Sequence, residues 1–192
     1  MMRLLGKFAR ETRGVAAIEF ALIVPFVILV YLGLFDLTTL ITVNRKVTYS
    51  TSVVADLVTQ NNTNVLQAQI TDYYNAAEMV MDPVPMSDVR VEVYGYRLVA
   101  GAVNQIWSVN NGQGSGCGAP STADLDDLML GGNDMVIAQV CTDFTPRTAM
   151  FLGEYLLGAP NFTVSQQIAQ RPRQVGNATL TCFVSSVGGA TC

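Results

Sequence analysis

Cysteine is the residue type with the most evident chemistry in this 192-residue chain. The four cysteines are Cys117, Cys141, Cys182 and Cys192, and no two of them form a C-x-x-C pair. That spacing does not favour a zinc site or thioredoxin-type redox chemistry. An even number of cysteines in an exported region instead favours disulfides, and four free, buried thiols are the alternative.

Four cysteines allow three connectivities, and loop length favours one of them. A short tail with two glycines separates Cys182 from Cys192, so closing this loop costs little chain entropy. We therefore expect the pairs Cys182–Cys192 and Cys117–Cys141. Pairing Cys117 with Cys182 and Cys141 with Cys192 would tie the tail across a sheet, and it stays open as the alternative.

The residues needed for common catalytic mechanisms are missing. The chain contains no histidine, which removes the commonest general base and the commonest metal ligand. The glycine-rich run Gly112–Gly118 lacks the spacing of a phosphate-binding loop, and Ser115 within it lacks a G-x-S-x-G setting. We interpret this run as a flexible loop. We expect no catalytic residue, no cofactor and no enzyme activity.

Four aspartates lie close together in the sequence: Asp124, Asp126, Asp127 and Asp134. In an exported protein such carboxylates could hold calcium or, in a less favoured hypothesis, serve an anchored hydrolase. The spacing and the glycine of an EF-hand loop are absent. We expect a solvated helix face here, and no metal.

The elements that position these residues belong to a chain that is 50% hydrophobic and 14% charged. Such values point to one long apolar segment that raises the average. The net charge is -4, and no basic run lies outside the N-terminus, so the positive surface that binds phosphates is missing. Nucleic acid is therefore not an expected partner.

The N-terminus combines a basic leader with a long apolar run. Residues 1–14 carry Glu11 and an excess of basic side chains, and the sequence from Phe20 to Phe35 has no charged residue. With the residues just before it, this run reaches the roughly 20 residues that cross a bilayer. The basic excess precedes the run, so we expect a cytoplasmic N-terminus and an external remainder. A cleaved secretory signal fits poorly, because no A-x-A-like site follows the run.

The segment RGVAAIEFALIVPF, followed by GLFD at residues 33–36, resembles the N-terminus of the TadE-like proteins of tight-adherence (Flp-type) pilus systems. These proteins are related to type IV pilins. The resemblance implies that a prepilin peptidase cuts after Gly14, so that Val15 becomes the first residue. Glu19 is then fifth and Phe20 follows it. Pro25 also matches the family, and the resemblance covers about residues 12–60.

Glu19 is costly in a membrane and therefore needs a partner. Cleavage before Val15 would create a positive amine one helical turn from the Glu19 carboxylate. Paired within a subunit or between staggered neighbours, the two charges offset each other's desolvation. The alternative is that Glu19 reaches the cytoplasmic headgroups of an uncleaved anchor. Pro25 removes one helical hydrogen bond and predicts a modest kink in the membrane helix.

Beyond the apolar run the pattern predicts an α+β domain with an antiparallel sheet, because helices come first and strands follow. Helical spacing continues to about residue 61, and a second amphipathic helix is predicted at 64–81. Strands are predicted from residue 89 through a bulge at Gly95, and at 103–109, 135–144, 162–169 and 180–184, with a short helix at 146–157. The expected parts are a leader at 1–14, a transmembrane and extended helix at 15–62, and an outer domain at 63–192.

These observations and the resemblance together favour a non-catalytic pseudopilin or minor pilin in the assembly of an adhesive pilus. The expected location is the bacterial inner membrane, crossed once, with the outer domain in the periplasm or in a surface pilus. Expected partners are the inner membrane, prepilin peptidase, and other pilins or pilus assembly proteins. The alternative is an uncleaved single-pass protein whose outer domain binds a partner protein or a polysaccharide.

Overall fold

The computed structural model describes residues 13–60, 64–123, 125–129, 134–147, 161–173 and 181–183. Its contacts divide the chain into two compact units. The first consists of Met1–Leu40 and Pro146–Pro160, and the second of Ile41–Thr145 and Asn161–Cys192. Helix α2 contributes its first half to one unit and its second half to the other.

Helix α2 (Arg13–Thr59) is the long helix that the apolar periodicity predicts, and it continues on both sides of Pro25. Its many hydroxyl side chains bond to its own backbone. Thr51 donates to the carbonyl of Val47 at 2.7 Å, and Thr59 donates to that of Ala55 at 2.9 Å. Such bonds satisfy polar groups inside the helix. The Thr59 hydroxyl also lies 3.2 Å from the side-chain oxygen of Gln170.

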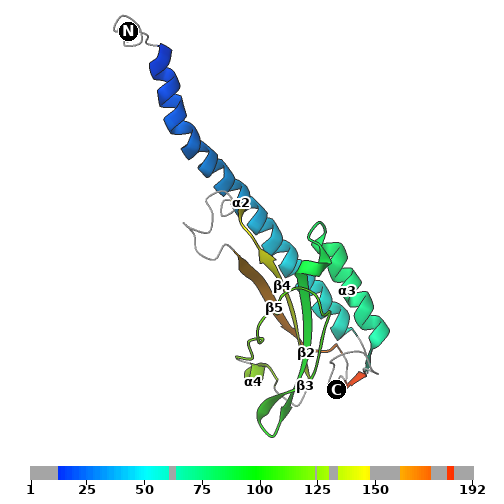
Figure 1. Cartoon of the computed structure of the whole chain (residues 1–192). Helices are drawn as coiled ribbons and strands as arrows, with labels where there is room; N and C mark the ends of the chain where they lie inside the picture. The colour runs from blue at the N-terminus through cyan, green and yellow to red at the C-terminus, as the bar shows by residue number, and fades with distance from the viewer. Residues whose placement is uncertain are drawn as a thin grey trace, which may run out of the picture. The chain divides into compact units, whose positions relative to one another are not determined.

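The second unit is built on a four-stranded antiparallel sheet, which confirms the predicted α+β class (Figure 1). The strand order is β3 (Ala102–Asn110), β2 (Val89–Val99), β4 (Met135–Phe144) and β5 (Phe162–Gln170). All but one residue of β4 are buried, because this strand lies between two neighbours and is covered on both faces. A nearly continuous apolar strand is what such a position requires.

One face of the sheet packs against helices. In register, Val91 and Val93 of β2 lie opposite Val140 and Ala138 of β4, and all four are buried. Figure 1 shows the outer half of α2 and helix α3 (Gln67–Met81) on one side of the sheet. The buried side chains of these helices recur at helical spacing: Val43, Val47, Val54, Val58, Ile70, Tyr73, Ala77 and Met81. This layer is one core of the second unit. Another buried cluster consists of Tyr96, Leu125, Met129, Met135 and Ile137.

Polar contacts hold the outer half of α2 to its neighbours. Gln166 of β5 donates to Asn44 at 3.3 Å, and Lys46 donates to the carbonyl of Asp82 just beyond α3. Arg173 pairs with Asp56, and its backbone N–H donates to the carbonyl of Thr59. The last bond satisfies a carbonyl at the end of α2 that has no partner within the helix.

The start of the predicted second helix is wrong by three residues. Asn64–Leu66 forms strand β1, which pairs in parallel with β6 (Thr181–Phe183), and α3 begins only at Gln67. A partner more than a hundred positions away holds these residues extended. Periodicity within one segment cannot reveal such a long-range pairing.

The predicted bulge occurs at Gly95, but the extra residue lies on β3. Gly95 pairs with Trp107 and Tyr96 pairs with Gln105, so Ile106 is skipped. Alternation along β2 therefore continues without a change of parity. Tyr94 and Tyr96 lie on the same face, with ring centroids 6.4 Å apart.

Two further expectations concern the chain around β4. The predicted helix at 146–157 lies outside the described residues except for its first two positions. The acidic segment forms the one-turn helix α4 (Leu125–Leu128), in which Leu125 is buried and Asp127 is exposed. A short 3-10 helix, η1 (Met86–Asp88), leads into β2.

Candidate functional site

The first half of α2 is an exposed apolar surface. No residue between 14 and 35 is buried, and the large exposed side chains include Ile18, Phe20, Leu22, Ile23, Phe26, Val27, Val30, Tyr31 and Leu34. Among the described helices, α2 is long and apolar enough to cross a membrane, with a mean hydropathy of 2.6 in its most apolar window. Such a surface is stable only against lipid or another apolar surface.

The residues of the proposed processing and assembly site all lie in this half of α2. Gly14, Val15, Glu19, Phe20 and Pro25 are helical, and Glu19 is exposed within the apolar surface. Val15 and Glu19 are four positions apart, so they lie on the same helix face, separated by about 6 Å of rise. The helix thus places the Glu19 carboxylate where the amine of a chain beginning at Val15 can reach it.

A cluster of three side chains, Phe35, Asp36 and Arg147, lies at the end of the apolar run of α2. The carboxylate of Asp36 accepts a hydrogen bond from the backbone N–H of Arg147 at 2.8 Å. The guanidinium carbon of Arg147 lies 4.8 Å from the ring centroid of Phe35. Asp36 is 8% exposed, whereas Arg147 is exposed. These contacts join two stretches of the first unit that are far apart in the sequence.

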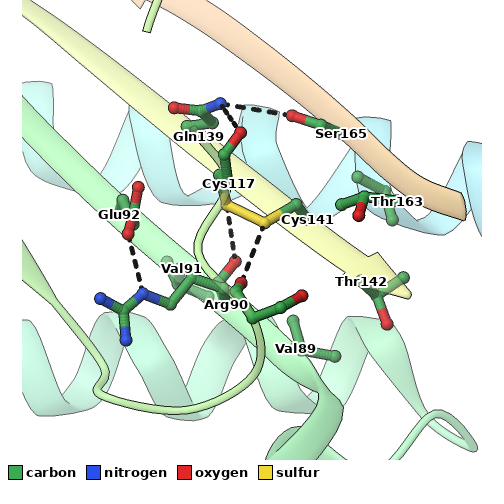
Figure 2. Close-up of a disulfide and its surroundings, with 12 residues drawn as sticks. Val89, Arg90, Val91, Glu92, Cys117, Gln139, Cys141, Thr142, Thr163 and Ser165 are labelled. Carbon is green, nitrogen blue, oxygen red and sulfur yellow. Dashed lines mark hydrogen bonds and ion pairs between the residues drawn. A yellow bond between two sulfur atoms is a disulfide. The ribbon is translucent and has the colours of Figure 1, made fainter. Parts of the chain in front are cut away.

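The face of the sheet opposite the helices carries a disulfide. Cys117 and Cys141 are bonded, with Cα atoms 5.5 Å apart, and this bond ties the glycine-rich loop to the central strand β4 (Figure 2). Cys141 is fully buried. The side chain of Cys182 and all of Cys192 lie outside the described residues, so their pairing stays a prediction.

Polar side chains surround this disulfide. Figure 2 shows Gln139 donating to the carbonyl of Cys117 and to Ser165, and Arg90 paired with Glu92. The Nε atom of Arg90 lies 2.8 Å from Oε1 of Glu92. Tyr94 donates to the other oxygen of Glu92 at 2.7 Å. Burial and this bond to the carboxylate raise the pKa of Tyr94 far above its usual value. Tyr94 therefore stays neutral and acts as a donor, which is the role that satisfies the buried carboxylate.

Two further links hold the loop to the sheet. Asp143 accepts hydrogen bonds from the hydroxyls of Ser115 and Thr163, both at 2.7 Å, and Gln167 bonds to both backbone groups of Ser121. The hydroxyl donors lower the pKa of Asp143. Its contribution to stability is therefore present above the ordinary pKa of the carboxyl group and is lost as the pH falls through the lowered value.

The interpretation of Asp134 as part of a solvated acidic face is wrong. Asp134 is 1% exposed and accepts two hydrogen bonds from the Arg97 guanidinium, at 2.6 and 2.7 Å. A buried carboxylate requires such a partner. In the parts of the chain that the structure describes, no group of three potential metal ligands comes together. Asp124 and the side chain of Asp126 lie outside those parts.

Sequence reasoning did not find the ion pairs or the Phe35–Asp36–Arg147 cluster. The Arg90–Glu92–Tyr94 set has a local signal, because residues two apart lie on the same face of a strand. The partners Arg97 and Asp134 have no such signal. Asp36 and Arg147 are 111 positions apart, and no local pattern links them.

Comparison with known proteins identifies one segment. Residues 14–56 match the model of the family described as TadE-like protein. The match covers the apolar half of α2 and much of its outer half, a minority of the 192 residues. No curated protein and no solved structure matches the chain. The N-terminal helix of this chain is thus similar to the TadE-like family over residues 14–56, which agrees with the resemblance read from residues 13–36.

Proposed function

We propose that the chain is a pseudopilin or minor pilin that acts in the assembly of an adhesive Flp-type pilus without catalysing a reaction. The TadE-like match supports this proposal because it includes the half of α2 that is apolar, exposed and interrupted by one carboxylate, Glu19. A single charge on such a surface favours association with a group of the opposite charge.

In this proposal α2 crosses the bacterial inner membrane once. The basic leader stays in the cytoplasm and the second unit lies in the periplasm or in the pilus. Prepilin peptidase removes the leader after Gly14, and the exposed apolar half of α2 then packs against the corresponding helices of other pilins. Glu19 pairs with the new amine at Val15, in the same subunit or in its neighbour.

The substitution Glu19→Gln tests the assembly role. The variant should remain in the membrane fraction, because a neutral side chain enters lipid more easily than a charged one. Pilus assembly should fall by about tenfold or more, because an amine without its carboxylate is costly in a low-dielectric interface. The measurement is the amount of pilin in the sheared surface fraction relative to the membrane fraction.

Glu78→Gln is the matched control, since Glu78 is an exposed glutamate on α3 and is not part of the apolar run of α2. This variant should assemble normally. Unimpaired pilus assembly by Glu19→Gln, with the protein properly inserted, would reject an assembly role for the Glu19 charge.

A further inference from the structure

The end of the apolar run has a position that helix geometry fixes. Val15 and Phe35 are twenty residues apart on α2, which corresponds to about 30 Å of rise. The hydrocarbon core of a bilayer is about 30 Å thick. If Val15 lies at one boundary of the core, Phe35 and Asp36 lie at the other. This step rests on the membrane crossing proposed above.

Arg147 is held at that boundary by two contacts with α2. Its backbone N–H donates to the buried Asp36 carboxylate, and its guanidinium lies over the Phe35 ring. The Asp36 carboxylate oxygen accepts its hydrogen bond from the Arg147 backbone, not from the guanidinium. Within the described part of the chain, no ion pair involves the Arg147 guanidinium. The positive charge is therefore positioned by an aromatic ring and remains exposed.

We propose that Arg147 binds the phosphate groups of anionic lipids on the side of the membrane where α2 emerges, and so fixes the depth of the helix. An arginine guanidinium suits this role because its planar donors bind phosphate oxygens in pairs while its face stacks on an aromatic ring. Aromatic and basic side chains at the boundary are also the usual anchors of a membrane helix.

Other charged side chains are few in the sequence near Asp36 and Arg147. Residues 148–160 read TAMFLGEYLLGAP, in which Glu154 is the sole charged residue. The next basic side chain along α2 is Arg45, nine residues past Asp36. Nine residues correspond to about 13 Å, whereas each headgroup layer is only about 5 to 7 Å thick. Along α2, Arg45 therefore lies beyond a headgroup layer that begins at Asp36.

The test uses the full chain, purified in mild detergent and exposed to an equal mixture of phosphatidylglycerol and phosphatidylcholine. Mass spectrometry of the retained lipid gives the preference for the anionic headgroup. The basic leader at residues 1–14 also attracts anionic lipid, so the quantity compared is the change between variants. Removing one basic side chain from a lipid surface should lower the preference for phosphatidylglycerol over phosphatidylcholine by a factor of about five. Arg147→Gln should therefore show about one fifth of the preference of the unaltered protein.

Arg45→Gln is the matched control, because it removes the same charge from an exposed residue farther along α2. It should keep the preference of the unaltered protein. Equal ratios for Arg147→Gln and the unaltered protein would overturn the proposal, as would an equal loss in both variants.

The unaltered protein supplies a second measurement if Arg147→Gln fails to fold. Its preference should fall towards one at high salt, because screening weakens an exposed charge contact. A preference that salt does not change would overturn the proposal. Failure of the membrane crossing itself has a different signature, since alkaline washing would then release the unaltered protein from membranes.

Discussion

Gly95→Ala should lower the free energy of unfolding of the second unit by about 3 kcal/mol, at the upper end of the cost of overpacking a core. A Cβ atom built on Gly95 would overlap the indole ring of Trp107. Trp107 is 2% exposed and pairs with Gly95 across the strands, so the ring cannot move aside without disturbing the core. The emission of Trp107, the sole tryptophan, reports the unfolding transition directly.

Gly116→Ala is the control for this substitution. A Cβ atom on Gly116 meets no atom within 4 Å, so the variant should have the same free energy of unfolding as the unaltered protein. Because Trp107→Phe removes much of the ring that the new methyl group meets, it should recover part of the loss in a Gly95→Ala background. That double variant needs circular dichroism as its probe. Unchanged stability of Gly95→Ala would contradict the close packing of the indole on the strand.

Removal of the Cys117–Cys141 disulfide should cost about 3.5 kcal/mol, the value that the chain-entropy model gives for a loop of this size. The bond closes a loop with a sequence separation of 24 and holds the glycine-rich segment on the sheet. The double variant Cys117→Ala/Cys141→Ala avoids placing a hydroxyl at the buried position 141. Thermal unfolding compares it with the unaltered protein.

Reduction of the unaltered protein should give a similar loss, because it breaks the same link without a substitution. Peptide mapping without reductant should recover a fragment that joins Cys117 to Cys141. A fragment that joins Cys141 to Cys182 or Cys192 would contradict the pairing. Equal stability of the double variant and the unaltered protein would show that the loop is held by hydrogen bonds alone.

Local patterns were enough to predict the elements that carry the proposed function. The run from Phe20 to Phe35, together with the apolar residues just before it, is apolar and long enough to predict a membrane-spanning helix, and its continuation keeps helical spacing up to the end of α2. The alternation of Val89, Val91 and Val93 with polar or aromatic residues is likewise a local pattern, and it predicted β2. In these segments each residue's preference agrees with its place in the fold.

Long-range contacts were beyond that reasoning. Strand β1 is extended because β6 pairs with it, and Asp134 is buried because Arg97 reaches it from another strand. The sequence around β1 does not indicate that β6 pairs with it, and the sequence around Asp134 does not indicate that Arg97 binds it. The contact of Asp36 with the backbone of Arg147 is of the same kind, since any residue other than proline could donate it.

The most direct test of the central claim is N-terminal sequencing of the protein extracted from the membranes of a host that has the matching prepilin peptidase. The proposal predicts a chain that begins at Val15, and a Gly14→Ala variant that is processed much less. A cut at this position places the new amine one turn from Glu19. An intact terminus at Met1 in the unaltered protein would contradict the account and favour an uncleaved anchor whose outer domain binds a partner.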